Sequence, residues 1–380
     1  MIDATRTPPP AFTVGVEEEY QLVDGETGAL RSRATAVREM DWSGDIIGES
    51  HETQIEIGTP VCTSAAEALQ ELARLRLQAA AAAASHDLRI VAAGAHPFSR
   101  WEGQQTTPGE RYDRIFERFG RIARDEHIFG MHIHVAIDGA RARIRTMNAL
   151  RHYLPHILAL AASSPIFEGD DTGFASFRSI LWRRWPTSGV PPRFRSLSEY
   201  RRFVELQLLT GAILDEGNVY WSVRPHAKFP TLEVRVGDVC PRLEDVAAIV
   251  ALVRAIVAAI AENEIAEPRT PGFSRGVERD VLAVNEWRAA SRGLDACIVD
   301  SDGSEAPLRK SIRAIVERVT PVAQELGDGE AITGIDGILE RGNGADRIRR
   351  ALRDEGSLSK LVGWLATETV AGAETVARAP

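Results

Sequence analysis

Acidic and imidazole side chains recur in four short segments whose residues alternate between apolar and polar types. The segments are residues 13–23, 52–58, 131–137 and 231–237. Side chains point to alternate faces of a strand, so each segment predicts a strand with one apolar and one polar face. If the four strands share a sheet, its polar face collects carboxylates, which repel one another unless cations bind between them. The polar-face residues are Thr13, Gly15, Glu17, Glu19, Gln21, Glu52, Gln54, Glu56, His132, His134, Thr231, Glu233 and Arg235.

The acidic residues of the first two segments are the candidate ligands of a divalent cation. Glu17 and Glu19 share one strand face, although Glu18 interrupts the apolar side, and Glu56 belongs to a similar face. A solvated strand face would show the same pattern. Glu49 lies seven residues before Glu56, so it joins the site only if the chain turns or bulges between them.

His132 and His134 form a sharper signal, because two histidines stand on the polar side of an otherwise hydrophobic strand. They are either ligands or buried histidines with hydrogen-bond partners. A His-x-His pair is typical of zinc hydrolases. The accompanying glutamates form an oxygen-rich set that favours Mg²⁺ or Mn²⁺.

Basic residues near these segments predict contacts with phosphate. Arg235 shares a face with Glu233, an arrangement that a cross-strand salt bridge would also explain. Planar guanidinium groups suit phosphate oxygens. Further candidates lie within the aromatic-rich stretch 163–196 and in the last hairpin. They are Ser176, Arg178, Arg183 and Arg184 in the stretch, and Arg224 and Lys228 in the hairpin.

Composition limits the classes of function. The 380 residues are 44% hydrophobic, which is enough for a large core, and the net charge of −9 disfavours nucleic-acid or anionic-membrane partners. Three cysteines are too few for a disulfide framework, so a reducing cytoplasm is expected. The apolar run at 246–261 is interrupted by Arg254 and predicts a buried helix rather than a membrane span.

The remaining segments predict an α+β fold in which helices segregate from antiparallel strands. Residues 1–11 are expected to be a disordered arm, and residues 12–380 a single catalytic domain. Helices are predicted over 64–85, 110–126, 142–162 and 197–214, and strands over 88–95, 218–224 and 231–239. Residues 163–196 are expected to be irregular, and their aromatic and arginine side chains favour a functional loop. Residues 242–375 are expected to be mostly helical, with a break at 326–344.

Several motifs are missing. The sequence contains no GxxxxGK[ST] phosphate loop, no GxGxxG after a strand and no GxSxG elbow. Metal-assisted phosphoryl transfer therefore fits better than covalent catalysis by a side chain.

Seven blocks, in this order, resemble glutamate–cysteine ligase type 2, the bacterial carboxylate–amine ligases. They are GVEEEYQLVD (15–24), ESHETQIEIGTPVC (49–62), GAHPF (94–98), GMHIHVAI (130–137), DTGFASFRS (171–179), RPHAKFPTLEVRVGD (224–238) and ERGNGADR (340–347). The resemblance implies a curved antiparallel sheet like that of glutamine synthetase, with helices on the convex face and ATP and divalent cations on the concave face. It implies a reaction in which ATP phosphorylates a carboxylate and an amine attacks the acyl phosphate.

The resemblance also implies roles for individual residues. Glu17, Glu49 and Glu56 would hold one Mg²⁺ or Mn²⁺ ion, and Glu19, His132 and Glu233 another. Arg235 and Arg178 would act in catalysis, and the ATP contacts would come from Arg178, Arg224, Lys228 and Arg235. Small-molecule carboxylate and amine substrates and a homodimer are expected. The alternatives are a small-molecule phosphotransferase of the guanidino type, which needs no amine, and a zinc hydrolase built on His132 and His134, which needs no nucleotide.

Overall fold

The computed structural model describes residues 11–40, 42, 45–268, 274–300 and 303–378. Nearly all of the predicted N-terminal arm lies outside these residues. No helix within the described ranges combines the length and the hydrophobicity needed to cross a membrane.

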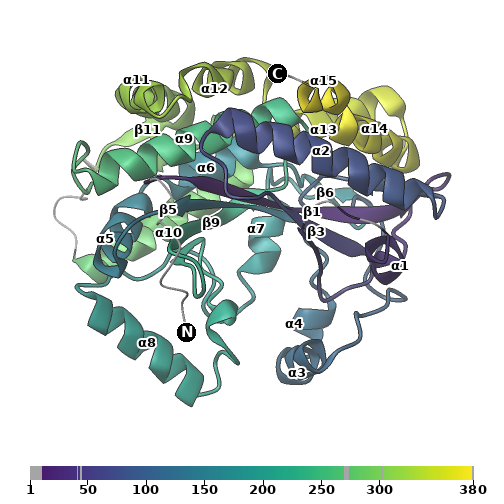
Figure 1. Ribbon diagram of the computed structural model, residues 1–380, viewed down its shortest axis with the longest axis horizontal. Helices are drawn as coiled ribbons and strands as arrows, with labels where there is room; N and C mark the ends of the chain where they lie inside the picture. The colour runs from purple at the N-terminus through teal and green to yellow at the C-terminus, as the bar shows by residue number, and fades with distance from the viewer. Residues whose placement is uncertain (1–10, 41, 43–44, 269–273, 301–302, 379–380) are drawn as a thin grey trace.

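A seven-stranded antiparallel sheet forms the centre of the molecule (Figure 1). Its spatial order is β2-β3-β1-β5-β9-β8, and β4 pairs with the far end of β1. All four predicted segments contribute to this sheet, and they lie side by side in the order β3, β1, β5 and β9. The strands are β1 (Val14–Asp24), β2 (Asp45–Gly48), β3 (Gln54–Gly58), β4 (Leu88–Val91), β5 (Gly130–Ala136), β8 (Val223–Pro225) and β9 (Thr231–Asp238).

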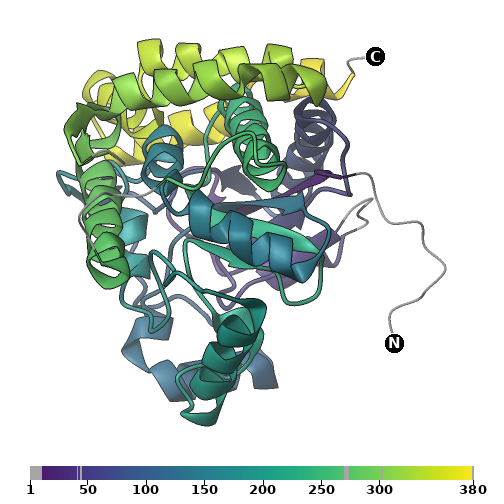
Figure 2. The same cartoon turned by 90° about the vertical axis from the view of Figure 1, so that its left-hand side faces the viewer.

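Helices cover one face of the sheet (Figures 1 and 2). The covering layer contains α2 (Ala65–Ala84), α9 (Leu243–Ala261), α11 (Leu308–Glu325), α12 (Gly329–Arg341), α13 (Gly344–Glu355), α14 (Leu358–Val370) and α15 (Ala373–Ala377). The opposite side carries α3 (Glu110–Phe119), α4 (Arg121–Arg124), α7 (Phe177–Trp182) and α8 (Leu197–Leu209). Helix α6 (Leu154–Ala161) is buried and packs against both β9 and α9. The remaining helices are α1 (Ala34–Arg38), α5 (Ala140–Leu150) and α10 (Arg275–Arg292).

Two buried arginines show how the covering layer tolerates charge. Glu18, which interrupts the apolar side of β1, forms an ion pair of 2.6 Å with Arg76 of α2, and both side chains are fully buried. Arg254 of α9 binds Asp328 at 2.7 Å and the carbonyl of Phe12 at 2.6 Å. Each buried charge therefore has a counter-charge and further hydrogen bonds, as buried charges require.

The α+β prediction is confirmed, and several element boundaries are corrected. Residues 142–162 form two helices, α5 and α6, because the chain turns before Pro155, which occupies the first turn of α6. The segment 163–196 contains α7 and the short strands β6 (Ile166–Phe167) and β7 (Asp170–Asp171). The expected break at 326–344 is wrong, because Gly329–Arg341 form α12. A 3-10 turn at Glu216–Asn218 replaces the start of the strand predicted at 218–224.

Candidate active site

A cavity of about 680 Å³ opens on the uncovered face of the sheet. Within the described residues, eight carboxylates line it against five cationic side chains. The excess of negative charge must be neutralised before an anionic nucleotide can bind there. The charged lining residues are Glu17, Glu19, Glu49, Glu56, Arg111, Glu126, Arg178, Asp215, Glu216, Arg224, Lys228, Glu233 and Arg235.

Strand register decides which of these residues meet. Glu17 of β1 lies opposite His132 of β5, and Glu19 lies opposite Glu56 of β3. Directly opposed residues have neighbouring side chains on one sheet face. Two groups of candidate metal ligands result, Glu17–His132–Glu233 and Glu19–Glu56–His132, each with ligand atoms within 4.8 Å of one another. This grouping differs from the expected one, because register pairs Glu19 with Glu56 and Glu17 with His132.

His132 is common to both groups and has a ring nitrogen available. Its Nδ1 lies 3.1 Å from Glu17 Oε2, while its Nε2 is buried with no hydrogen-bond partner among the described residues. Burial and the nearby Arg235 lower the pKa of His132 to about 4, so the ring is neutral at pH 7. If Nδ1 donates its proton to Glu17, the lone pair of Nε2 remains free for a cation. The residues present therefore fit a divalent cation.

The carboxylates show the electrostatic signature of a cation site. Burial, reinforced by Glu49, raises the pKa of Glu19 to about 7. Burial and the neighbouring carboxylates Glu49, Glu17 and Glu19 raise the pKa of Glu56 well above its usual range. Glu17 behaves differently: its burial favours a higher pKa, but His132 and His134 hold it well below the usual value. Bound cations would remove the repulsion within this set.

Glu49 reaches the cavity because β2 and β3 form an antiparallel pair. It directly follows β2, and Ile47 of that strand lies opposite Glu56. The chain therefore turns between Glu49 and Glu56, which is the condition under which Glu49 was expected to join the site. Burial raises the pKa of Glu49, although Arg111 and Arg235 oppose this shift.

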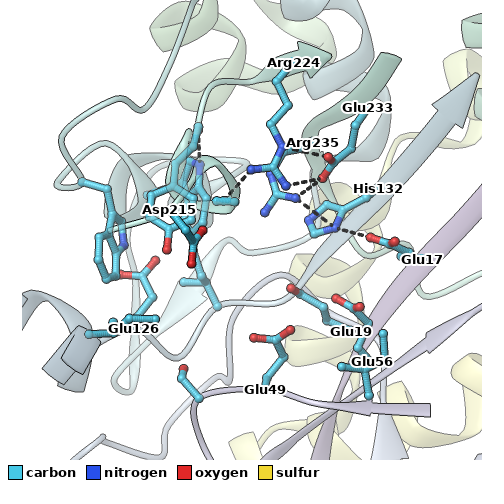
Figure 3. Close-up of a pocket in the computed structure, with 18 of the residues that line it drawn as sticks. Glu17, Glu19, Glu49, Glu56, Glu126, His132, Asp215, Arg224, Glu233 and Arg235 are labelled. Atoms are coloured by element: carbon cyan, nitrogen blue, oxygen red, sulfur yellow. Dashed lines mark hydrogen bonds and ion pairs between the residues drawn. The ribbon is translucent and has the colours of Figure 1, made fainter. Parts of the chain in front are cut away.

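Glu233 anchors two arginines at the opposite end of the ligand set (Figure 3). It accepts hydrogen bonds from Arg224 at 2.7 and 3.1 Å and from Arg235. Burial favours a higher pKa for Glu233, but Arg235 and Arg224 hold it well below its usual range. Arg224 also donates to the carbonyls of Gly217 and Val219. Its donors are directed to the protein, which favours a positioning role over phosphate contact.

Arg178 reaches the sheet from α7 and is held there by Asp238. The two side chains lie 3.9 Å apart, and Asp238 accepts hydrogen bonds from Ser164 and Ser176, each at 2.7 Å. Arg178 and Arg235 both lie near the ring of Trp182, at 6.0 and 5.7 Å from its centroid. A Cβ atom at Gly130 would overlap the Arg178 guanidinium, so only glycine permits this approach.

Other residues named in the sequence analysis are placed elsewhere or have other partners. His134 contacts Glu17 at 3.2 Å and Thr231 at 3.2 Å and belongs to neither ligand group, so the described residues give no support to a zinc site built on both histidines. Arg183 forms an ion pair with Glu286 outside the cavity, and Arg184 forms ion pairs with Asp125 and with Glu126 of the cavity wall. Lys228 is exposed at the cavity rim.

Sequence reasoning missed Asp238, Gly130, Glu126 and the aromatic wall made by Trp182, Trp185 and Tyr220. Asp238 lies an odd number of positions after Glu233 and Arg235 on β9, so simple strand alternation would place it on the other face of the sheet. The β5–β9 pairing is irregular, because its register shifts between Met131 and Ile133. Glu126 stands just after a helix and has no periodic signal.

Solved structures share this architecture. Glutamate–cysteine ligase of Francisella tularensis, crystallised with AMP, superposes with a TM-score of 0.70 at 13% identity, covering 97% of this chain and 90% of that one. A bifunctional glutathione synthetase of Pasteurella multocida gives a TM-score of 0.68 at 15% identity, covering 95% of this chain and 52% of that one. At these identities the likeness shows the fold alone.

Sequence comparison identifies the class of protein. The family model of glutamate–cysteine ligase family 2 matches residues 13–363. A protein of Solibacter usitatus, named provisionally as glutamate–cysteine ligase 2, is 39% identical over 96% of this chain and 94% of its own length. A Mycobacterium protein named in the same way is 40% identical over 94% of this chain and 99% of its own length.

The chain belongs to glutamate–cysteine ligase family 2. The predicted class, an ATP-dependent ligase that joins a carboxylate to an amine, is thereby confirmed.

Proposed function

We propose that the chain joins glutamate, through its γ-carboxylate, to an amine such as cysteine, with ATP as the source of activation. The observation that carries this proposal is the convergence of two pairs of carboxylates, Glu17 with Glu233 and Glu19 with Glu56, on His132. The Nε2 atom of this histidine has no hydrogen-bond partner among the described residues, and Arg178 and Arg235 line the same cavity. A bare carboxylate has oxide as its leaving group, so an amine does not displace it. Phosphorylation supplies a good leaving group.

The reaction has two balanced steps. A carboxylate oxygen attacks the γ-phosphorus of ATP, the bond to the ADP oxygen breaks, and ADP leaves. The amine nitrogen then attacks the acyl carbon, the carbon–oxygen bond to phosphate breaks, and the amine loses a proton. Arg235 and Arg178 supply buried positive charge where the transferred phosphoryl group would lie, which stabilises charge that develops during transfer.

Glu17, His132 and Glu233 would hold one divalent cation, and Glu19 and Glu56 a second beside His132; Glu49 adds a carboxylate to the same cavity. Mg²⁺ or Mn²⁺, when bound, neutralises phosphate charge and orients the nucleotide. We further propose that residues 12–380 act as one catalytic domain. A cytoplasmic location and a homodimer stay predictions.

ADP release tests this function. With ATP, Mg²⁺ and glutamate, we expect release that increases when cysteine or another member of an amine panel is added, and that stops with EDTA. Turnover that depends on an acceptor alone would indicate a phosphotransferase. Amide cleavage without nucleotide would indicate a hydrolase, and either result would replace the ligase proposal.

A further inference from the structure

Arg178 lines the cavity with a guanidinium group whose donors are hardly used by the protein. The residue is 2% exposed, and its Nη1 and Nη2 atoms both contact the carbonyl of Arg235 at the long distance of 3.4 Å. Arg224 differs, because its donors bind Glu233 and two backbone carbonyls. The Arg178 guanidinium therefore keeps donors for an anionic ligand, and other contacts must fix its position.

Asp238, at the end of β9, supplies the counter-charge of Arg178. It is the only carboxylate in the described part of the chain that forms an ion pair with this arginine, and its side chain is fully buried. The distance from Asp238 Oδ1 to Arg178 Nη1 is 3.9 Å, which is too long for a hydrogen bond. The pair thus balances charge but does not by itself orient the guanidinium.

Two serines connect Asp238 to the first turn of α7, the helix that carries Arg178. Ser176 is the N-cap of α7: its Oγ donates to Asp238 Oδ1 at 2.7 Å and accepts from the N–H of Ser179 at 3.3 Å. Ser164 Oγ donates to Asp238 Oδ2 at 2.7 Å and accepts from the N–H of Arg178 itself at 3.0 Å. Each oxygen of the carboxylate therefore holds the start of the helix through one serine.

Asp238 is itself held firmly. It accepts a third hydrogen bond, of 2.8 Å, from the N–H of Ser163, and a Cβ at Gly94 would overlap its side chain. Burial raises the pKa of Asp238, while Arg178 and the three hydrogen bonds oppose this shift. All three partners donate, so both carboxylate oxygens act as acceptors.

We propose that Asp238 is a positioning residue for phosphoryl transfer, which acts through Ser164 and Ser176 to hold Arg178 at the reacting group. Asp238 does not belong to the described lining of the cavity, so its effect on the reaction passes through Arg178. This assignment rests on the proposed function, in which Arg178 meets the transferred phosphoryl group.

A double-mutant cycle tests the assignment, with ADP release from ATP, Mg²⁺, glutamate and cysteine as the measurement. Asp238→Asn keeps the volume but replaces one acceptor oxygen by an N–H donor. It should displace Arg178 and lower kcat roughly 100-fold. In an Arg178→Lys background the same substitution should lower kcat less than about threefold, because the group that Asp238 positions is already lost. A purely structural role would lower kcat by the same factor in both backgrounds.

A second variant and a control accompany the cycle. Ser176→Ala keeps every charge and removes one hydroxyl, so kcat should fall about 3- to 10-fold, again only where Arg178 is present. If Asp238→Asn does not fold, Ser176→Ala decides the question by the same comparison. The matched control is Asp245→Asn, because Asp245 is 2% exposed and pairs with Arg347 on the helical side of the sheet. It should lower Tm and leave kcat unchanged.

Each outcome decides a separate point. Equal losses in both backgrounds, or full activity of Asp238→Asn and Ser176→Ala, would overturn the positioning role and leave the ligase function standing. ADP release that needs no amine would replace the ligase by a phosphotransferase, and the cycle would still test Asp238 because both reactions transfer a phosphoryl group. No ADP release from the wild type would overturn the ligase function and this assignment with it.

Discussion

Glu19 of β1 lies directly opposite Glu56 of β3, so two carboxylates face each other across an antiparallel strand pair. Burial and mutual repulsion raise the pKa of both, to about 7 for Glu19. The two carboxylates repel each other when both are ionised, and a divalent cation bound between them would remove this repulsion. The stability of the protein should therefore depend on pH and on bound metal.

The first prediction concerns the pH dependence of stability without metal. The folded pKa of Glu19 exceeds the ordinary value of 4.5, so the folded state binds the proton more tightly than the unfolded state. Stability is therefore retained below about pH 4.5 and is lost as pH rises towards about 7. Melting curves in EDTA should show Tm falling across this window, and Glu19→Gln should flatten the fall. A Tm that rises steadily across the window in EDTA would contradict the assignment.

The second prediction concerns metal addition. Mg²⁺ binds the ionised carboxylates, so its stabilising effect should increase with pH across the same window. At a concentration 100 times Kd the gain is about 2.7 kcal/mol, which corresponds to a rise in Tm of several degrees. Melting curves with Mg²⁺ or Mn²⁺ measure it, and Ca²⁺ and Na⁺ serve as comparisons. An unchanged Tm with both Mg²⁺ and Mn²⁺ would count against the site.

The third prediction separates two glutamates of the site by their effect on stability. Both Glu56→Gln and Glu233→Gln should abolish turnover. Glu56→Gln removes repulsion and should raise Tm in EDTA. Glu233→Gln leaves Arg224 and Arg235 without their shared counter-charge, which costs about 3–5 kcal/mol for a broken buried pair, and should lower Tm. Wild-type rates in both variants would refute the ligand assignment.

The fourth prediction concerns Gly130, where a Cβ would overlap the Arg178 guanidinium. Gly130→Ala should displace this flexible end without unfolding the protein, so kcat should fall roughly 100-fold while Tm changes little. The control is Gly276→Ala on α10, where a Cβ meets nothing within 4 Å and activity should be retained. A normal kcat in Gly130→Ala would mean that Arg178 does not act at the reacting group.

The fifth prediction concerns the planar guanidinium group of Arg235. Arg235→Lys keeps the charge but loses the planar set of donors that holds Glu233, so kcat should fall roughly 100- to 1,000-fold. Arg242→Lys, in an ion pair with Glu368 on the helical side, should leave kcat unchanged. Equal kinetics in the two variants would remove Arg235 from the reaction.

The alternation of residue types by itself determined the strands, their polar and apolar faces and the acidic character of the site. Period-two patterns place Glu17 and Glu19 on one face of their strand, and His132 and His134 on one face of theirs, whatever the rest of the chain does, because strand geometry is local. The ordered motifs also determined the family.

The tertiary structure decided which ligands meet, because register is set by pairing between segments far apart in the chain. Pairing places Glu19 opposite Glu56 and Glu17 opposite His132, and the β2–β3 pair brings in Glu49. Packing of α4, α7 and β9 places Glu126 in the cavity wall and Asp238 beside Arg178. Their environments depend on burial and on hydrogen-bond partners, and neither property can be read from a single segment.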